Sequence, residues 1–149
     1  MDETLLEQYK AEVIRELNET EFIRHLGLEF TELSEKFAIG RIPFEKKLTN
    51  YFGHIHGGIL YSLADTVAGT LACMGGRKVT TVDGHMNFLD PVENTEYVYC
   101  EAKRVRSGKH LMVVKIKIRD DRGKLLDDGS FTFYRLKLPV LAETESGQA

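Results

Sequence analysis

The stretch from Gly57 to Gly76 reads GGILYSLADTVAGTLACMGG, a long apolar run with a glycine pair at each end. Asp65 is the only charged residue in it. A carboxylate in an apolar helix is costly unless it is paired, hydrogen-bonded or protonated. The pair Gly57-Gly58 places free backbone amides at the helix start, where an anion or a developing oxyanion can bind. A carboxylate and free amides on one helix indicate an active site.

This stretch is about as long as a membrane-spanning helix. A mid-helix Asp opposes membrane insertion by about 2.5–3.5 kcal/mol, and Ser62, Thr66 and Thr70 add hydroxyl groups. We therefore expect a buried helix of a globular protein and no membrane association.

Length and composition indicate one domain of an ordinary globular protein. The chain has 149 residues, of which 42% are hydrophobic and 29% charged, enough to bury a core without disulfides. Its net charge of -3 argues against a general nucleic-acid binder. Cys73 and Cys100 lie in apolar contexts and are expected as core residues of a reducing compartment. The first ten residues, MDETLLEQYK, lack a signal-peptide pattern, which predicts a cytoplasmic protein.

The N-terminal segment is expected to be helical over residues 4–24. Thr4 and Glu7 are spaced as a capping box, and apolar residues follow at helical spacing. Thr20 interrupts the pattern and is expected to cap a short turn that ends at Gly27. The segment is predicted to be a lid or packing helix. The domain layout is a helical extension over residues 1–20, a folded domain over 21–138 and a flexible tail over 139–149.

The remaining segments are predicted to be strands. Two precede the apolar helix within residues 28–44, and residues 45–56 form a polar loop. Alternating apolar patterns then predict four more strands, over residues 79–89, 94–106, 110–119 and 125–137. Short turns between strands imply an antiparallel sheet. A helix that is apolar on nearly every side must be wrapped, so we expect an α+β fold, with a curved sheet around a long central helix and edge strands protected by a second subunit.

Specific residues support a family resemblance. The chain carries Asn50-Tyr51-Phe52-Gly53-His54-Ile55-His56-Gly57-Gly58, followed by Leu63-Ala64-Asp65. This pattern resembles the hotdog-fold acyl-CoA thioesterases, in the PaaI-like (phenylacetic acid degradation) branch of the 4-hydroxybenzoyl-CoA thioesterase superfamily. The resemblance covers about residues 21–137 and leaves the N-terminal helix unassigned. It implies a hotdog fold and hydrolysis of an acyl-CoA thioester to a free acid and CoA.

Thioester hydrolysis needs an activated water or a covalent nucleophile, together with donors that hold the carbonyl oxygen as it becomes negative. The resemblance assigns the first role to Asp65 and the second to the Gly57 backbone amide. It further implies that Asn50 and His56 position the reactants and that Thr81 assists Asp65. Each of the last three also has a plain structural interpretation: a turn residue, a helix-entry cap and a strand Thr.

Helix geometry separates the two main groups. Asp65 follows Gly57 by eight residues, which is about 12 Å along a helix. One chain cannot easily present both groups to one thioester. The family solves this across a dimer, and we expect Asp65 of one protomer to face Gly57 of its partner, in a homodimer that pairs again into a homotetramer.

Basic residues around a predicted hairpin suggest where CoA phosphates bind. A solvated, charged hairpin is an equally good interpretation of the same residues. The candidates are Lys103, Arg104, Arg106, Ser107, Gly108 and Lys109.

No metal or redox cofactor is expected, because His54 and His56 alone do not complete a zinc site. Cys73 is not expected to be a nucleophile, because nothing nearby in the sequence would lower the pKa of its thiol. Two other functions stay open: a hotdog acyl-thioester dehydratase or hydratase, and a non-catalytic acyl-CoA-binding protein. The acyl group is not specified, although Tyr51, Phe52, Tyr61 and Phe88 are candidates to line its pocket.

Overall fold

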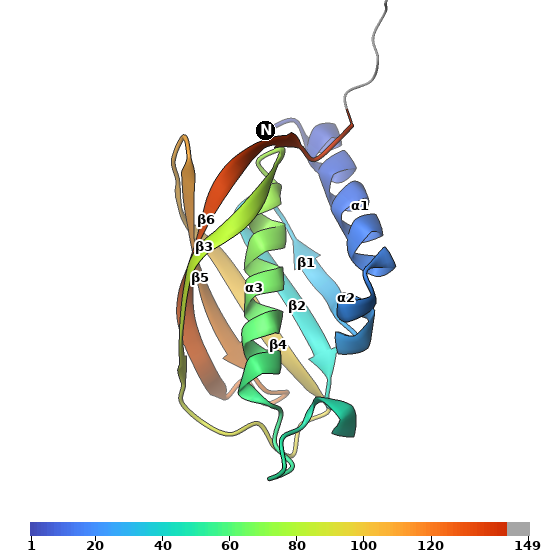
Figure 1. Ribbon diagram of the computed structural model, residues 1–149, viewed down its shortest axis with the longest axis vertical. Coiled ribbons are helices and arrows are strands. Elements are labelled where there is room, and N and C mark those ends of the chain that lie inside the picture. The colour runs from blue at the N-terminus through green and yellow to red at the C-terminus, as the bar shows by residue number, and fades with distance from the viewer. Residues whose placement is uncertain (143–149) are drawn as a thin grey trace, which may run out of the picture.

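A six-stranded antiparallel sheet curves around one long helix in the computed structural model, which describes residues 1–142 (Figure 1). The strand order is β1-β2-β4-β5-β6-β3. The elements are α1 (Glu3–Glu19), α2 (Glu21–Leu26), β1 (Glu29–Leu33), β2 (Phe37–Pro43), the 3-10 turn η1 (Lys46–Leu48), α3 (Gly57–Cys73), β3 (Arg77–Phe88), β4 (Tyr97–Ser107), β5 (Leu111–Arg119) and β6 (Leu125–Pro139).

Helix α3 packs one face against the concave side of the sheet. Its buried residues recur at helical spacing, among them Leu60, Leu63, Val67 and Leu71. The helix and sheet approach closely where β2 carries Gly40, because a Cβ there would lie 2.5 Å from Val67 Cγ2. The expected central helix is therefore present, although the sheet wraps only one side of it.

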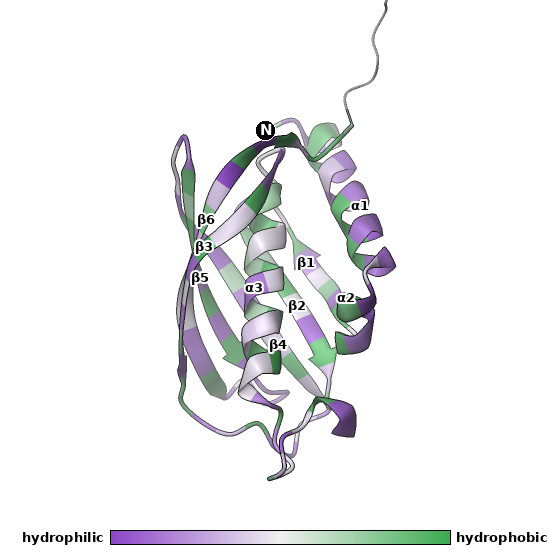
Figure 2. Ribbon diagram, viewed as in Figure 1, coloured by the Kyte–Doolittle hydropathy of each residue, from purple (hydrophilic) through white to green (hydrophobic). Residues whose placement is uncertain are grey.

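Helices α1 and α2 lie beside α3 and cover the end of the sheet near β1 (Figure 1). Val13, Ile23 and Leu26 bury their side chains in the common core. Figure 2 shows that α1 mixes strongly hydrophilic and hydrophobic residues, whereas α3 is pale along most of its length. The N-terminal helix is thus part of the same packed body as the sheet.

Two local predictions about this segment need correction. Helix α1 begins at Glu3, one residue earlier than expected, and the Asp2 carboxylate accepts a hydrogen bond from the Thr4 amide at 3.0 Å. Asp2, not Thr4, is therefore the N-cap, and the capping box is wrong. Thr20 does precede a short helix that ends at Gly27 with a positive φ of 70°, but its hydroxyl donates to the Glu16 carbonyl instead of capping that helix.

The order of strands differs from a simple meander. Strand β3 does not pair with β4, which follows it in the chain. It pairs with β6 and forms one edge of the sheet. The segment around Asp90-Pro91 is therefore a crossover and not a hairpin turn. Strand β3 is an edge strand of twelve residues, and most of its side chains are exposed. A long exposed edge of this kind is suited to pairing with a second chain.

The packed body continues beyond the expected boundary at residue 138. Val140 is buried, and its amide donates to the Gly76 carbonyl at 2.9 Å. The rest of the expected tail, residues 143–149, lies outside the described residues. Within residues 1–142, no helix combines the length and apolarity that a membrane span requires.

Candidate active site

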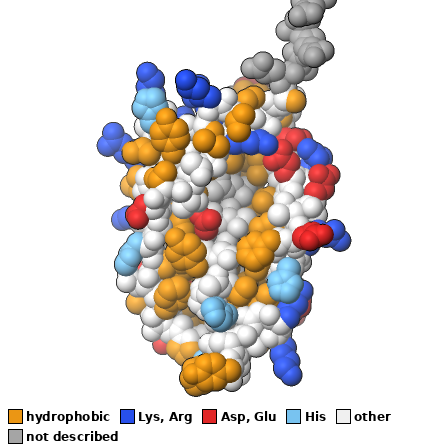
Figure 3. All heavy atoms as spheres, in the orientation of Figure 1, with side chains coloured by type: hydrophobic (Ala, Val, Ile, Leu, Met, Phe, Trp, Pro, Cys, Tyr) orange, Lys and Arg blue, Asp and Glu red, His pale blue; other side chains and the backbone are white. Residues whose placement is uncertain are grey.

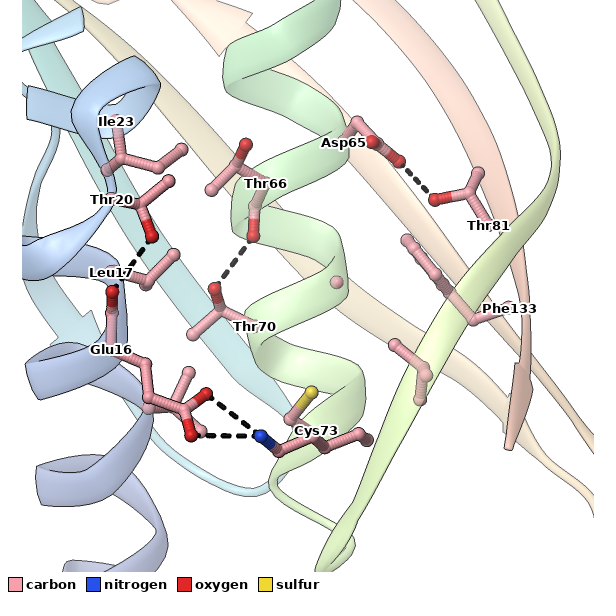
Figure 4. A pocket seen from close by; sticks show the side chains of 14 residues that line it. Glu16, Leu17, Thr20, Ile23, Asp65, Thr66, Thr70, Cys73, Thr81 and Phe133 are labelled. Carbon is pink, nitrogen blue, oxygen red and sulfur yellow. Dashed lines mark hydrogen bonds and ion pairs between the residues drawn. The ribbon is translucent and has the colours of Figure 1, made fainter. Parts of the chain in front are cut away.

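Asp65 and Thr81 meet at the open face of α3. The Thr81 hydroxyl donates a hydrogen bond to Asp65 Oδ1 at 2.7 Å, joining α3 to β3 (Figure 4). Asp65 is half-buried, and no Lys, Arg or His within residues 1–142 forms an ion pair with it. The carboxylate therefore keeps lone pairs free for a further donor such as a water molecule. The structure brings together two of the predicted site residues.

Asp65 lies in a groove of about 390 Å³ along the open face of α3. Helices α1 and α2 form one wall, and β3 forms the other (Figure 4). Figure 3 shows this face hollowed along α3, with hydrophobic side chains gathered on both sides. Gly69 and Cys73 share the face with Asp65, as helical spacing predicts for residues four and eight positions away. Thr66 also lines the groove. The surface of the groove is thus mainly apolar.

Sequence reasoning missed several residues of this groove. Leu17 and Thr20 come from the N-terminal helices, and Lys78 comes from β3. The four-residue spacing of Thr66 and Thr70 could have predicted that these two residues share a face of α3. The residues from α1 and β3 carry no such signal, because their approach depends on the tertiary fold.

The start of α3 leaves one backbone amide free. His56 is the N-cap, and its Nδ1 accepts a hydrogen bond from the Gly58 amide at 2.8 Å. The Gly57 amide has no hydrogen-bond partner within the described part of the chain. It lies at the positive end of the helix dipole, where it can donate to an oxyanion. The interpretation of His56 as a cap is confirmed, and the cap leaves the Gly57 amide available.

Asn50 organises the loop before α3. Its Oδ1 accepts hydrogen bonds from the Phe52 and His54 amides at 3.0 and 3.2 Å. The interpretation of Asn50 as a turn residue is therefore confirmed. Its side-chain NH₂ group is not needed for the turn and can donate to another group. Asn50 and Gly57 line a common hollow of about 230 Å³.

The two halves of the candidate site lie in different hollows of one chain. Asp65 faces the long groove, whereas Gly57 lines the hollow at the base of α3. Their eight-residue separation corresponds to about 12 Å along the helix axis.

The four aromatic candidates do not line the Asp65 groove of their own chain. Tyr51 and Phe52 are exposed on the loop, and Phe88 lies beside Gly57. The Tyr61 ring packs against Phe131, with 5.2 Å between ring centroids.

The predicted basic cluster is divided between structural and open positions. Arg104 forms an ion pair with Glu35 at 3.6 Å, and Ser107 Oγ accepts a hydrogen bond from Arg135. The Gly108 amide donates to the Leu111 carbonyl at 2.8 Å and closes the hairpin. That amide is engaged within the hairpin, so it does not favour the expected phosphate contact.

Open cationic side chains remain near the tip of the β4–β5 hairpin. Lys109 lines two hollows there, of about 460 and 750 Å³. Arg106 lines the smaller hollow, and the larger one adds cationic residues that were not predicted, namely Arg77, Arg135 and Lys137. The pairing of β3 with β6 brings these residues together, and no local sequence pattern predicts that pairing. Lys103 lines neither hollow.

Cys73 lines the Asp65 groove as a free thiol. Burial raises the pKa of this thiol to about 11, so it is protonated near neutral pH and is a poor nucleophile. His54 pairs with Glu93 at 3.2 Å, apart from the His56 cap. Asp65 is the acidic group in the groove that is suited to act on water.

A sheet curved around a long helix, with a half-buried carboxylate on the helix and a free amide at its start, is the arrangement expected for a hotdog-fold thioester hydrolase. The model of the thioesterase superfamily matches residues 52–126, which include Gly57, Asp65 and Thr81. The chain belongs to this superfamily and is an enzyme of the thioester hydrolase class.

Two curated relatives agree with this membership. A protein of Haemophilus influenzae, provisionally named as an esterase, is 29% identical over 78% of this chain and 86% of its own length. A similarly named protein of Saccharolobus solfataricus is 31% identical over 84% of this chain and 85% of its own.

Solved structures show the same fold at low sequence identity. The PaaI protein of the E. coli phenylacetic acid degradation operon has a TM-score of 0.82 and 21% identity, covering 90% of this chain and 98% of that one. A hypothetical thioesterase from Streptococcus pneumoniae, whose structure contains coenzyme A, has a TM-score of 0.71 and 20% identity. It covers 75% of this chain and 88% of that one. The expected hotdog fold is confirmed.

Proposed function

We propose that the protein hydrolyses acyl-CoA thioesters to free acids and CoA, with a water molecule activated by Asp65. The observation that carries this proposal is the contact of Asp65 with Thr81 inside an apolar groove. The carboxylate has one fixed neutral donor and no cation partner among the described residues, so it can accept a proton from water held beside it.

The reaction balances with these groups alone. Asp65 accepts a proton as the water oxygen bonds to the thioester carbonyl carbon. The carbonyl oxygen becomes negative and accepts a hydrogen bond from a Gly57 amide. The carbon–sulfur bond then breaks, the acid is released, and the proton held by Asp65 passes to the CoA sulfur. Asn50 and the His56 side chain fix the loop and helix start that present the Gly57 amide.

The complete site is proposed to form between two chains. Asp65 and Gly57 line separate hollows of one chain. The exposed edge strand β3 carries apolar side chains in the open, with Val82 54% and Phe88 53% exposed. Pairing of two β3 edges would cover this surface and carry the Gly57 end of one α3 toward the Asp65 of the other. This arrangement supports a homodimer, and further pairing of dimers would give the expected homotetramer.

The CoA nucleotide is proposed to bind near the tip of the β4–β5 hairpin. Arg106 and Lys109 line the hollows there, and Arg77, Arg135 and Lys137 add positive charge. Pyrophosphate and ribose phosphate groups favour such a surface. The presence of coenzyme A in the pneumococcal neighbour is consistent with this assignment.

The hydrogen bonding of the His56 ring favours hydrolysis over the alternative hydratase or dehydratase chemistry. A general base on His56 would need a free ring nitrogen, but Nδ1 accepts the Gly58 amide. The proton of the neutral ring is then on Nε2, which makes that nitrogen a donor.

An acyl-CoA panel with a thiol reagent tests the proposal. Wild type is expected to release CoA from at least one acyl-CoA, and Asp65→Asn is expected to release it at least about a hundredfold more slowly. No CoA release from any acyl chain would reject hydrolysis. Undiminished release by Asp65→Asn would remove Asp65 from the mechanism.

A further inference from the structure

An ion pair closes one end of the Asp65 groove. Lys78 Nζ on β3 lies 2.9 and 3.2 Å from the two carboxylate oxygens of Glu16 on α1. Figure 4 shows Glu16 on the α1 wall, at the end of the groove that holds Cys73 and away from Asp65. Both residues of the ion pair line the groove. The groove thus has the Asp65 carboxylate toward one end and a bridge of opposite charges at the other.

The walls between these two ends suit an apolar chain. The Thr20 hydroxyl donates to the Glu16 carbonyl at 2.9 Å, and the Thr70 hydroxyl donates to the Thr66 carbonyl at 2.8 Å. Because both protons are engaged within their own helices, these residues offer no donor to a ligand. Gly69 adds no side chain to the floor, which keeps the groove open above α3.

We propose that the Glu16–Lys78 bridge sets the length of the acyl group that the enzyme accepts. This inference rests on the proposed acyl-CoA hydrolysis and names its substrate class as medium-chain acyl-CoA. From Asp65 to Cys73 the helix advances eight residues, or about 12 Å, which an extended acyl chain of about ten carbons spans. A longer chain must displace the bridge or leave its end in water. The N-terminal helix is therefore a specificity element that supplies one half of the bridge.

Removal of the bridge is expected to leave the fold intact. Both side chains are 40% exposed, and ion pairs of this exposure contribute little to stability. Lys78→Ala and Glu16→Ala each remove one side chain of the bridge and open the end of the groove. The matched control is Arg15→Ala, which breaks ion pairs to Glu12 and Glu19 on the same helix without touching the groove.

Calorimetric binding of straight-chain acyl-CoAs tests the proposal in an Asp65→Asn background, where hydrolysis does not interfere. In this parent, affinity is expected to rise about fourfold per CH₂ group and to stop rising at medium chain length. With Lys78→Ala or Glu16→Ala added, the rise is expected to continue to longer chains. The double exchange Glu16→Lys with Lys78→Glu is expected to restore the limit, and Arg15→Ala is expected to leave it unchanged.

Three outcomes would overturn the inference: no acyl-CoA binding, no plateau in the parent, or the same plateau with and without the bridge. The proposed hydrolysis is judged separately, from CoA release by wild type. Failure of hydrolysis with a bridge-dependent plateau would reject the enzyme and keep the length limit. Hydrolysis together with a bridge-independent plateau would support the proposed enzyme activity and reject the length limit.

Discussion

The Thr81 hydroxyl and the Asp65 carboxylate, 2.7 Å apart, connect the central helix to the exposed edge strand. A hydrogen bond to a carboxylate is worth about 1.5–3 kcal/mol, and here it fixes the direction of the remaining lone pairs. Thr81→Val is expected to lower kcat about tenfold and to leave KM nearly unchanged. Thr81→Ser keeps the hydroxyl and is expected to retain most of the activity. Steady-state kinetics of both variants checks this, and equal losses would contradict a role for the hydroxyl.

The cap at the start of α3 gives a prediction about stability. The His56 ring accepts the Gly58 amide, so His56→Ala is expected to cost about 1 kcal/mol in free energy of unfolding. His56→Asn supplies another acceptor at the N-cap and is expected to recover most of that loss. Urea unfolding measures both variants. If Asn and Ala destabilise equally, the Gly58 hydrogen bond does not stabilise the helix start.

Elements formed by local periodicity could be predicted from the sequence, but their partners could not. The apolar run predicted α3, and the alternation of apolar and polar residues predicted the strands. Burial of one face imposes the helical and strand spacings of apolar residues. The pairing of β3 with β6 depends on how the whole sheet curves around α3. Glu16 and Lys78 lie 62 residues apart in the chain, and only the tertiary fold brings them together. The Asp65–Thr81 contact was within reach because a family pattern suggested it, whereas the N-terminal wall lay outside that pattern.

Close packing of α3 on the sheet predicts strong sensitivity at Gly40. A Cβ at that position would lie 2.5 Å from Val67 Cγ2 and 3.0 Å from Leu28 Cδ1. Gly40→Ala is therefore expected to destabilise the fold by about 1–3 kcal/mol through overpacking. The control is Gly123→Asn, at a positive φ of 79° with no atom within 4 Å of an added Cβ. Thermal unfolding compares the two, and equal midpoints would contradict the close approach.

A buried carboxyl outside the site predicts a pH-dependent stability. Asp127 is fully buried, and neither carboxyl oxygen has a hydrogen-bond partner within the described residues. Burial, with a smaller effect of Asp128, raises the pKa of Asp127 to about 7. The folded state then holds a proton that the unfolded chain releases near pH 4, so this group's contribution to stability falls from about pH 4 to about pH 7.

Replacement of Asp127 by Asn is expected to remove that dependence. Asp127→Asn should exceed wild type in free energy of unfolding at pH 8, by on the order of a few kcal/mol, and should differ little at pH 4. The control, Asp90→Asn, alters an exposed carboxylate beside Lys124. Chemical unfolding at a series of pH values measures the difference. A constant gap between wild type and Asp127→Asn across that range would contradict the raised pKa.

Mixed dimers test whether Asp65 and Gly57 act across two chains. Asp65→Asn and Gly57→Val are each expected to be nearly inactive as homodimers, the second because a side chain beside Phe88 obstructs the thioester. In a heterodimer one site carries both changes, and the other combines the intact Asp65 of one chain with the intact Gly57 of its partner. After unfolding and refolding an equimolar mixture, about a quarter of wild-type activity is expected to return. The control is each variant refolded alone, which should recover none. If both groups served a reaction centre within one chain, every site in the mixture would keep a defect, and the mixture would stay as inactive as its parents.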